Sequence, residues 1–487
     1  MFKNIQQFEE GGINNLQKVE KEFISTKDMA GLVTGISREV MNLGIGIIEE
    51  TLEYYDEVIR QRAERKEKWQ VVRRDRKSLI TSLGTVQYYK TLYKDKKTGE
   101  CCYLLDSNLG LDDHQRMTED AEAKLLEEAV QTSYRKGGEA VSLLDNVSKE
   151  TVMNKIHALD FSRIRKDKPE KKRAVKYLYI DADEDHASLQ YNTCKGDLKI
   201  SDYGRKNNCI PTKMVYVYEG IEKEAPESQR KKLVGARYFC GVYSGRLENQ
   251  RLWQEVYDYM EANYDLGQVK KVYLNSDGGG WIRNAGGRIH GLTRVLDEFH
   301  LEKYLLKMTG HMLDSADDAR RELVNAIRHG SREDFGRIAE KLIGYGESDR
   351  EKQRIAESAN YILSNWSASK VRLQRGSTVI GCSAEGHVSH VLSDRMSSRP
   401  LGWSREGADK MARLRAYYFN HGDMLELVKA QALPKAAGCE NDIILKPSLV
   451  ENESLYPLWG KYVEHANHSV SIQGQKLAWL AAQIDYI

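Results

Sequence analysis

The sequence predicts an α+β protein of several domains, with an α/β core whose strands end in acidic residues. Its 487 residues are enough for roughly two to four domains. Hydrophobic residues make up 40% and charged residues 30% of the chain, which suits a soluble globular protein. In the middle of the chain, short apolar runs of strand length are joined by stretches of helical period, and acids follow several of these runs.

The overall charge of the chain predicts no partner, whereas two local basic stretches could bind a nucleic acid. The 74 lysines and arginines nearly balance the 72 aspartates and glutamates, so only local patches carry a strong charge. Residues 60–77 and 163–173 are rich in Lys and Arg and suit contacts with a nucleic-acid backbone. A solvated surface is the alternative for both stretches.

Cysteine usage and hydrophobicity argue against a disulfide-rich, zinc-binding, secreted or membrane protein. Seven cysteines without a CxxC pair indicate neither a disulfide framework nor a zinc site. No signal peptide is recognisable, and no apolar run approaches the ~18 residues of a membrane-spanning helix. We therefore expect a cytoplasmic protein with no membrane partner.

Residues 1–77 are expected to be helical, and residues 78–117 to form a small β-sheet. Apolar side chains recur in the helical part at i, i+4, i+7 and i+11, namely Ile48, Leu52, Tyr55 and Ile59. Acidic residues interrupt the polar face, so the stripe is expected to pack inside the protein. The sheet should have about three strands, with Asp95–Gly99 as a hairpin turn in which Gly99 supplies a positive φ.

Residues 118–162 predict three helices in a helix-turn-helix layout. Polar residues begin or cap the three helices, namely Thr118, Ser133 and Ser148. The second helix is expected to run through Leu144, and the third to span Lys149–Leu159. The side chains that should face outward for the major groove are Lys149, Asn154 and Lys155. A structural helix bundle gives similar patterning and stays open as the alternative.

Residues 174–304 are expected to form the first part of the α/β core. The strand-like runs are 175–180, 213–220, 233–243 and 272–274, with a helix at 247–263 before the last of them. Asp181 and Asp183 follow the first run, and Asp277 follows the last. Ligands of open α/β sheets bind at the carboxyl ends of strands, so these acids are candidate catalytic or metal-binding residues. Acids exposed to water at a polar strand end are the alternative.

Three glycines, Gly278–Gly280, follow Asp277 directly. They could cradle a phosphate, but the GxGxxG spacing is absent and no Lys-Ser or Lys-Thr follows. A plain strand-to-loop turn, with Asp277 as its polar lead-in, is the other interpretation. Beside two further acids, the glycines would clear space for a DNA backbone.

The rest of the chain is expected to be mostly helical. Residues 292–306 should form a helix that contains Asp297 and His300, and residues 305–372 an all-helical block. Val379–Ile380 is expected to be a short strand in the second part of the core.

This second part of the core is expected to span residues 373–420. Glu385 lies near the start of a helix there, and Ser404 should cap a later one. Residues 421–487 show no motif that we can interpret.

The acids and the residues around them resemble a known family. The segments YIDADED, NSDGGGW and SAEGHVSHVLSDRMSSRPLGWS contain Asp183, Asp277 and Glu385 in order. This set is similar to the DDE transposases of bacterial insertion sequences, akin to the Mutator-like superfamily. The resemblance covers roughly residues 120–420. Asp181 competes with Asp183, which is favoured because the family's Asp is followed by a short polar turn into the next strand.

The resemblance implies a ribonuclease H-like core with a helical insertion, and an enzyme that cuts and joins DNA at the ends of an insertion sequence. Asp183, Asp277 and Glu385 would be catalytic and would hold two Mg²⁺ or Mn²⁺ ions ~3.5–4 Å apart. Supporting roles would fall to Asp181 and to the pair Asp297 and His300, although a pair that only braces its helix is the alternative.

The implied partner is double-stranded DNA, as terminal inverted repeats and as target, bound by a homodimer or a higher oligomer on paired ends. We expect DNA contacts from a set of basic, amide and aromatic side chains, namely Lys149, Asn154, Lys155, Arg165, Lys166, Lys171, Lys172, Arg173, Trp366, Arg395 and Arg399. Trp366 could stack on an unpaired base or pack in a core.

Two rival functions stay open, and a third is disfavoured. The chain could be a transposase-derived DNA-binding regulator without catalysis, or a ribonuclease H-fold nuclease that acts on branched DNA. Glycoside hydrolysis also uses paired carboxylates, but it explains neither the basic linker nor a third acid.

Overall fold

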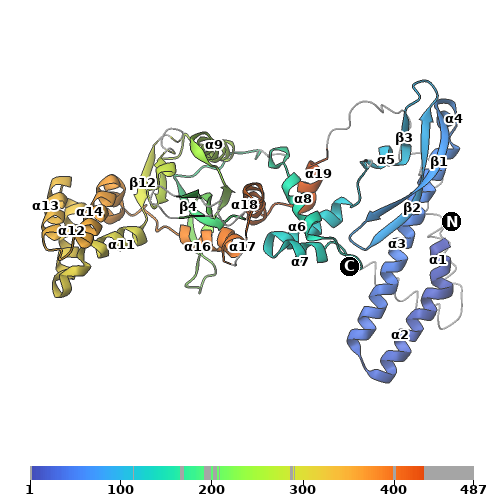
Figure 1. The fold of residues 1–487 in the computed structure, drawn as a ribbon, viewed down its shortest axis with the longest axis horizontal. Helices are drawn as coiled ribbons and strands as arrows, with labels where there is room; N and C mark the ends of the chain where they lie inside the picture. Colours follow the sequence, from blue (N-terminus) through green and yellow to red (C-terminus); the bar gives the residue numbers. More distant parts are fainter. Residues whose placement is uncertain are drawn as a thin grey trace. The chain divides into compact units, whose positions relative to one another are not determined.

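The computed structural model describes residues 3–432, except at 113, 165–168, 191–198, 201–205, 208, 284, 286–288, 290 and 399–401. At 199–200 and 206–207 it describes the backbone alone. The described residues divide into two units, one that ends at Thr118 and one of Glu119–Ala432 (Figure 1). In the part of the chain that is described, none of the helices combines the length and hydrophobicity that crossing a bilayer requires.

The first unit begins with helices. They are α1 (Lys3–Gln7), a π-helical turn (Phe8–Gly12), α2 (Ile13–Thr26), α3 (Met29–Gln61) and α4 (Ala63–Lys68). The Asp28 side chain caps α3 by accepting the Gly31 N–H. The predicted apolar stripe on α3 packs against the small sheet, where Ile59 is fully buried and the other three side chains are partly buried.

The three strands of the small sheet are antiparallel, in the order β1 (Trp69–Ile80), β2 (Thr85–Asp95) and β3 (Cys101–Tyr103). The hairpin at Asp95–Gly99 is confirmed, because Asp95 accepts the N–H groups of Lys97 and Thr98, and Gly99 has φ +78°. Helix α5 (Leu104–Leu109) follows.

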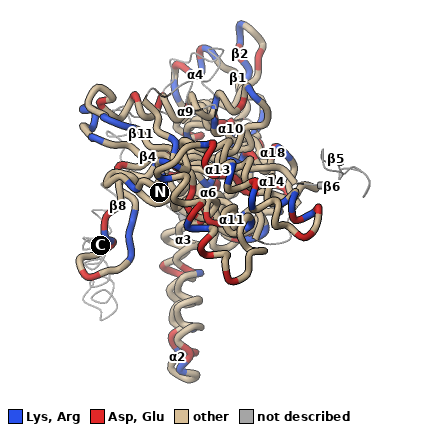
Figure 2. The backbone as a smooth tube through the Cα atoms, turned by 90° about the vertical axis from the view of Figure 1, so that its left-hand side faces the viewer, with Lys and Arg blue, Asp and Glu red and all other residues tan. Residues whose placement is uncertain are grey.

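The predicted boundary at residue 77 is wrong, because β1 begins at Trp69. It pairs with β2 from Trp69 opposite Asp95 to Ile80 opposite Thr85. Much of the basic run 60–77 is therefore strand, with exposed arginines at 73, 74 and 76. Figure 2 shows lysines and arginines in blue along the backbone near the labels β1 and β2. A pattern of alternating charges along a strand resembles a solvated helix when its pairing partner is unknown.

The second unit opens with the helices α6 (Glu119–Gln131), α7 (Tyr134–Glu139) and α8 (Lys149–Ala158). Ser133 and Ser148 cap α7 and α8 as predicted. Helix α7 ends before Leu144, because the Ser142 hydroxyl accepts the N–H groups of Leu144 and Asp145 and forms a turn. These helices pack with α18 (Arg405–Phe419) and α19 (Met424–Ala430) from the end of the described chain.

A mixed sheet of five strands lies at the centre of this unit. In spatial order the strands are β10 (Arg237–Gly241), β7 (Cys209–Tyr218), β4 (Tyr177–Ser188), β11 (Lys271–Ser276) and β12 (Leu292–Leu296). β7 is antiparallel to β10 and β4, whereas β11 is parallel to β4 and β12. Two small hairpins, β5 (Lys199–Ile200) with β6 (Lys206–Asn207) and β8 (Gly220–Lys223) with β9 (Lys231–Val234), complete the described strands.

Further local predictions in this unit are wrong. Leu292–Leu296 is strand β12 and not helix, because it pairs with β11 from Val272 to Ser276. The helix begins only after Asp297. Val379–Ile380 is not a strand but part of a loop between helices. Short apolar runs of this kind take the conformation that their distant neighbours impose.

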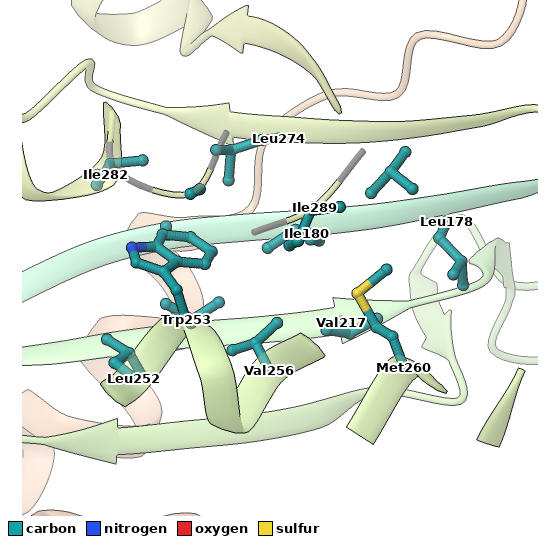
Figure 3. Packing of buried hydrophobic residues seen from close by; sticks show 14 of the residues in the cluster. Leu178, Ile180, Val217, Leu252, Trp253, Val256, Met260, Leu274, Ile282 and Ile289 are labelled. Atoms are coloured by element: carbon teal, nitrogen blue, oxygen red, sulfur yellow. The ribbon is translucent and has the colours of Figure 1, made fainter. Parts of the chain in front are cut away.

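The two faces of the mixed sheet differ. One face packs Leu178, Ile180, Val217 and Leu274 against α9 (Gly245–Asn263), whose Trp253, Val256 and Met260 are buried there (Figure 3). The alternate positions carry a row of stacked tyrosines on the other face, namely Tyr179, Tyr216, Tyr218 and Tyr273. The period of two along each strand therefore separates an aliphatic layer from a polar, aromatic one.

The remaining helices follow the sheet. Short α10 (Gly280–Arg283) precedes β12, and the helical block consists of α11 (Glu298–Thr309), a 3₁₀ turn (Gly310–Ser315), α12 (Ala316–His329), α13 (Arg332–Gly344), α14 (Asp349–Ser364) and α15 (Trp366–Gln374). The block has its own core. Next come α16 (Ala384–Val388), a π-helical turn (Ser389–Ser393), α17 (Asp394–Met396) and α18, which Ser404 caps as predicted.

Candidate active site

The parallel register places three aspartates at one level of three adjacent strands. Ser276 pairs with Ala182 of β4 and with Leu296 of β12. The residues that come next along the three segments are Asp183, Asp277 and Asp297. The Asp297 N–H also donates to the Ser276 carbonyl at 2.8 Å, which extends this pairing. The three aspartates thus form an acidic edge at the carboxyl ends of β11 and β12, where α/β sheets bind ligands. Asp183 lies inside β4, which runs on to Ser188, and not after its strand as the sequence predicts.

Asp183 is half-buried and has an unusual charge environment. Burial raises its pKa to about 6, and the negative charge of Asp277 adds to the rise. The Glu184 N–H, which donates to Asp183 Oδ1 at 2.8 Å, and the charge of His300 act in the opposite direction. Two carboxylates that repel each other in this way would gain from a cation between them.

Asp183→Asn is expected to stabilise the metal-free protein at pH 8. A raised pKa means that folding favours the protonated carboxyl, so its stabilising contribution is lost as pH rises through about 6. The amide carries no charge, and the free energy of unfolding should rise by roughly 1–2 kcal/mol at pH 8. Urea unfolding at pH 8 and pH 4.5 measures this. A gain of equal size at both pH values would contradict the explanation.

Asp277 lies in the loop after β11, and two hydrogen bonds hold this loop, one from its own backbone and one from α14. Its Oδ1 accepts the Gly279 N–H at 2.8 Å, and its carbonyl accepts the Tyr361 hydroxyl of α14. Gly278 has φ +83°, and a Cβ there would lie 2.4 Å from Asn365 Oδ1. Gly278 therefore makes room for Asn365, whereas the sequence suggested that it makes room for a DNA backbone. At Gly280, a Cβ would meet nothing within 4 Å.

Gly278→Ala is expected to lower the free energy of unfolding by about 1–3 kcal/mol, from the strained φ and the contact with Asn365. Gly280→Ala is the matched control, because a Cβ there enters open space. It should leave stability nearly unchanged. Urea unfolding of both variants makes the comparison. Similar losses in the free energy of unfolding would mean that neither the positive φ of Gly278 nor its contact with Asn365 causes the loss.

Asp297 and His300 form a close pair at the start of α11. The imidazole Nδ1 lies 2.9 Å from Asp297 Oδ2, and Asp297 also caps the helix by accepting the His300 N–H. The hydrogen bond with Asp297 raises the pKa of His300, and the charge of Asp277 adds to this effect. Burial alone would raise the pKa of Asp297, but the bond and charge of His300 lower it overall.

Asp181 is fully buried, unlike Asp183. Burial raises its pKa, while hydrogen bonds from Asn275 and three further donors oppose that rise. Both oxygens accept two hydrogen bonds each from protein groups, so Asp181 has no free position for a metal ion. This separates the two aspartates that the sequence left in competition, in favour of Asp183 as a ligand.

Glu385 is exposed in the first turn of α16, on the tyrosine-bearing face of the sheet. Ser383, just before this helix, bonds to Asp181 and Tyr216 of that face. Within the described residues, no three His, Cys, Asp or Glu side chains converge closely enough to hold a metal ion. Asp183 and Asp277 fit a hard divalent ion by their oxygen donors and their mutual repulsion, but Glu385 does not join them in a closed cluster.

The residues expected to bind DNA fall into different environments. Lys149, Asn154, Lys171 and Lys172 are exposed. Lys155 pairs with Glu122 of α6 at 2.5 Å, and Arg173 pairs with Glu219 and lies 4.4 Å from the Tyr264 ring centre. Both of these cations are thus already held by the protein. Arg165, Lys166 and Arg399 lie outside the described residues.

Two of the expected DNA contacts are wrong, because their side chains are buried. Trp366 is only 8% exposed and packs edge-on against Phe335 in the core of the helical block. Arg395 is 5% exposed, donates to the Ala129 carbonyl at 3.1 Å and lies over the Trp403 ring. Trp366 therefore follows the core-packing alternative, and Arg395 braces helices.

Sequence reasoning missed the polar residues that support the acids. Asn275 donates to Asp181, and Arg372 donates to Asn275 Oδ1 at 2.9 Å. Tyr361 holds the loop of Asp277. Asn275 had a detectable signal, since it follows the run 272–274 directly, stands two residues before Asp277 and so shares its face. The other two sit in helices whose place against the sheet is not visible in the sequence.

Fold and site together define a class: an α+β protein of two units, with an acidic centre on β4 and at the neighbouring ends of β11 and β12 in a mixed five-stranded sheet. Residues 22–431 match the family described as "Uncharacterised protein family (UPF0236)". The chain belongs to this UPF0236 family, since the match covers most of its length.

Its relatives include bacterial proteins of similar length. A UPF0236 protein of Caldanaerobacter subterraneus subsp. tengcongensis, named after four gene loci, is 37% identical over 81% of this chain and 79% of its own length. Another from the same bacterium, named after eleven loci, is 36% identical over the same shares. A UPF0236 protein of Streptococcus gallolyticus, named for the vanSb 3′ region, is 23% identical over 71% of this chain and 73% of its own.

Proposed function

We propose that this protein is a DDE-type DNA transposase, which cleaves DNA at the ends of an insertion sequence and joins them to a target. The adjacent placement of Asp183, inside the central strand β4, and Asp277, directly after the neighbouring parallel strand β11, carries the proposal. These are carboxylates of the type that metal-dependent phosphodiester chemistry requires, and their charges interact.

The architecture supports a ribonuclease H-like core. Its five strands run in the order β10-β7-β4-β11-β12, with three antiparallel strands continued by two parallel ones. We take this sheet, with the first acid on the central strand β4, as the core that the resemblance implies. A helical block separates Asp277 from Glu385 in the sequence, as the resemblance to Mutator-like transposases implies.

The naming of the relatives adds support of a different kind. One relative is named after eleven loci of one bacterium and another after four. Repeated occurrence in a single genome is typical of mobile DNA. The proposed partners are accordingly the terminal inverted repeats and a target duplex, bound by a dimer or higher oligomer of this chain.

Asp183, Asp277 and Glu385 would hold two Mg²⁺ or Mn²⁺ ions. Bound ions of this kind activate the attacking oxygen and stabilise the leaving oxygen in an in-line displacement at phosphorus. The protein's own residues would do the rest. The Tyr361 and Gly279 contacts hold Asp277 in place, and His300, kept cationic over a wider pH range by Asp297, offers positive charge to a phosphate.

The direct test uses the purified chain and duplexes taken from the termini of a genomic copy with inverted repeats. Mg²⁺- or Mn²⁺-dependent nicking and end joining is expected, together with its loss in EDTA. A four-way junction of unrelated sequence is the comparison substrate. Preference for the junction would indicate a structure-specific nuclease instead.

One observation favours a second function, that of a transposase-derived DNA-binding regulator. Glu385 is exposed and does not form a closed metal cluster with the two aspartates among the described residues. If the chain binds the inverted repeats with either metal present but never nicks them, the regulator is the better description.

Lys149→Ala is expected to weaken DNA binding and to lower the slope of log K against log salt by about one unit per lost phosphate contact. Lys149 is exposed at the start of α8, where its charge can reach DNA. Lys155→Ala should have a smaller effect, because that ammonium pairs with the largely buried Glu122 at 2.5 Å. By contrast, Lys149 has only an exposed contact with Glu150 at 3.7 Å. Fluorescence anisotropy across a salt series measures both slopes. An unchanged slope for Lys149→Ala would remove α8 from the DNA interface.

A further inference from the structure

The Asp181 carboxylate joins two parts of the second unit. Its Oδ1 accepts Asn275 Nδ2–H at 2.7 Å and the Tyr218 hydroxyl at 3.1 Å. Its Oδ2 accepts the Tyr216 hydroxyl at 2.7 Å and the Ser383 N–H at 3.1 Å. Oδ1 therefore faces neighbouring strands, whereas Oδ2 also faces the segment that leads into α16.

The Oδ2 side fixes the start of α16. Since the Tyr216 hydroxyl donates its hydrogen to Asp181, the Ser383 hydroxyl must donate to the Tyr216 oxygen, 2.9 Å away. A second contact joins His387 Nδ1 of α16 to the Tyr238 hydroxyl at 2.8 Å. α16 continues without a break into the π-helical turn and α17, and these contacts fix the first turn of that helical segment, which carries Glu385.

The Oδ1 side connects to the helical block. Asn275 accepts Arg372 Nη2–H at 2.9 Å, and Arg372 of α15 also donates to the carbonyls of Leu296 and Ile380. A continuous series of buried side chains thus runs from α15 through β11 and β4 to α16. Asp183, two residues after Asp181, shares its face of β4.

We propose that Asp181 is a positioning residue, which holds α16 and thereby Glu385 on the sheet face that carries Asp183 and Asp277. The proposal rests on the proposed function in one respect, namely that Glu385 is the third metal ligand. Asp181 itself touches neither metal nor DNA. Its effect on the site passes through the Ser383 N–H and the Tyr216 hydroxyl.

Two tyrosines of β7 offer a matched pair of variants. Tyr216→Phe removes the hydroxyl that joins Asp181 to Ser383, but keeps the ring that lies 4.8 Å from the His387 ring. Tyr218→Phe makes the same change two residues later and also removes one donor to Asp181, on the Oδ1 side. Only the first removes a bond to the segment that begins α16.

The first measurement is Mn²⁺ binding by electron paramagnetic resonance, together with the cleavage rate and the affinity for terminal DNA. Tyr216→Phe is expected to weaken Mn²⁺ binding about 10-fold and to lower kcat, with DNA affinity unchanged. Tyr218→Phe should stay near wild type in all three. Asp181→Asn should weaken Mn²⁺ binding by about 10–100-fold, and thermal unfolding controls for its folding.

The second measurement needs neither metal nor activity. Hydrogen exchange of the amides at 383–388 should become faster in Tyr216→Phe than in Tyr218→Phe. Equal exchange in the two variants, or equal losses of Mn²⁺ affinity, would overturn the positioning role. A wild-type protein that binds no Mn²⁺, but shows the selective change in exchange, would overturn the proposed function and leave the positioning role intact.

Discussion

Asp277→Asn is expected to lower DNA cleavage by at least about 10³-fold while DNA binding and folding persist. The amide has the size of the carboxylate but lacks the negative charge that a divalent ion requires. The amide oxygen can still accept the Gly279 N–H. In the native protein this hydrogen bond, 2.8 Å from Gly279 N to Asp277 Oδ1, holds the loop. The loss should therefore fall on kcat and on Mn²⁺ affinity, measured beside anisotropy on terminal DNA.

Asp265→Asn is the matched control for this variant. Asp265 also accepts a backbone N–H two residues on, that of Gly267 at 3.2 Å, but it lies before β11 and away from the strand ends. Normal cleavage by Asp265→Asn and none by Asp277→Asn would support a catalytic role. If Asp277→Asn unfolds the chain, Asp277 is a structural turn residue, and if it cleaves normally, the acidic edge is not the active site.

Arg372→Ala is expected to lower the free energy of unfolding by about 3–5 kcal/mol, a large effect for a single side chain. Arg372 is only 3% exposed, and its guanidinium serves the carbonyls of Leu296 and Ile380 and the amide of Asn275. Truncation leaves three acceptors without their donor in a region with little access for water. Urea unfolding, followed by tryptophan fluorescence, measures the loss.

Arg375→Ala provides the comparison at the end of the same helix. Arg375 is largely exposed and pairs with Glu298, and such surface pairs contribute about 0–1 kcal/mol. A small loss here and a large one at Arg372 would assign the effect to the buried hydrogen bonds. Comparable losses would mean that any truncation at this helix end destabilises the helical block, and that the hydrogen bonds of the Arg372 guanidinium do not cause the effect.

Local patterns predicted several elements correctly because local chemistry decides them. The caps at Ser133, Ser148 and Ser404 and the turn at Asp95–Gly99 depend on side chains that bond to their own backbone. Strand β12 was mistaken for helix because its pairing partner lies about twenty residues earlier, across a glycine-rich loop.

Burial explains the other errors. Trp366 was a candidate for base stacking, but Phe335 and the helices around it enclose the indole. Arg395 was a candidate for DNA contact, but it reaches the Ala129 carbonyl of α6. Neither neighbour is close in the sequence, and side-chain type alone does not distinguish a basic or aromatic residue in the core from one at the surface.

By itself, the sequence determined the order of the acids along the chain, but it predicted that the first strand ends at Ile180, whereas β4 continues through Asp181 and Asp183 to Ser188. Only the tertiary structure decided their different roles. The four donors that saturate Asp181 come from β7, β11 and the segment before α16, and the parallel register brings Asp277 beside Asp183. Contacts between distant segments depend on strand pairing and on packing, which the composition of any one segment does not specify.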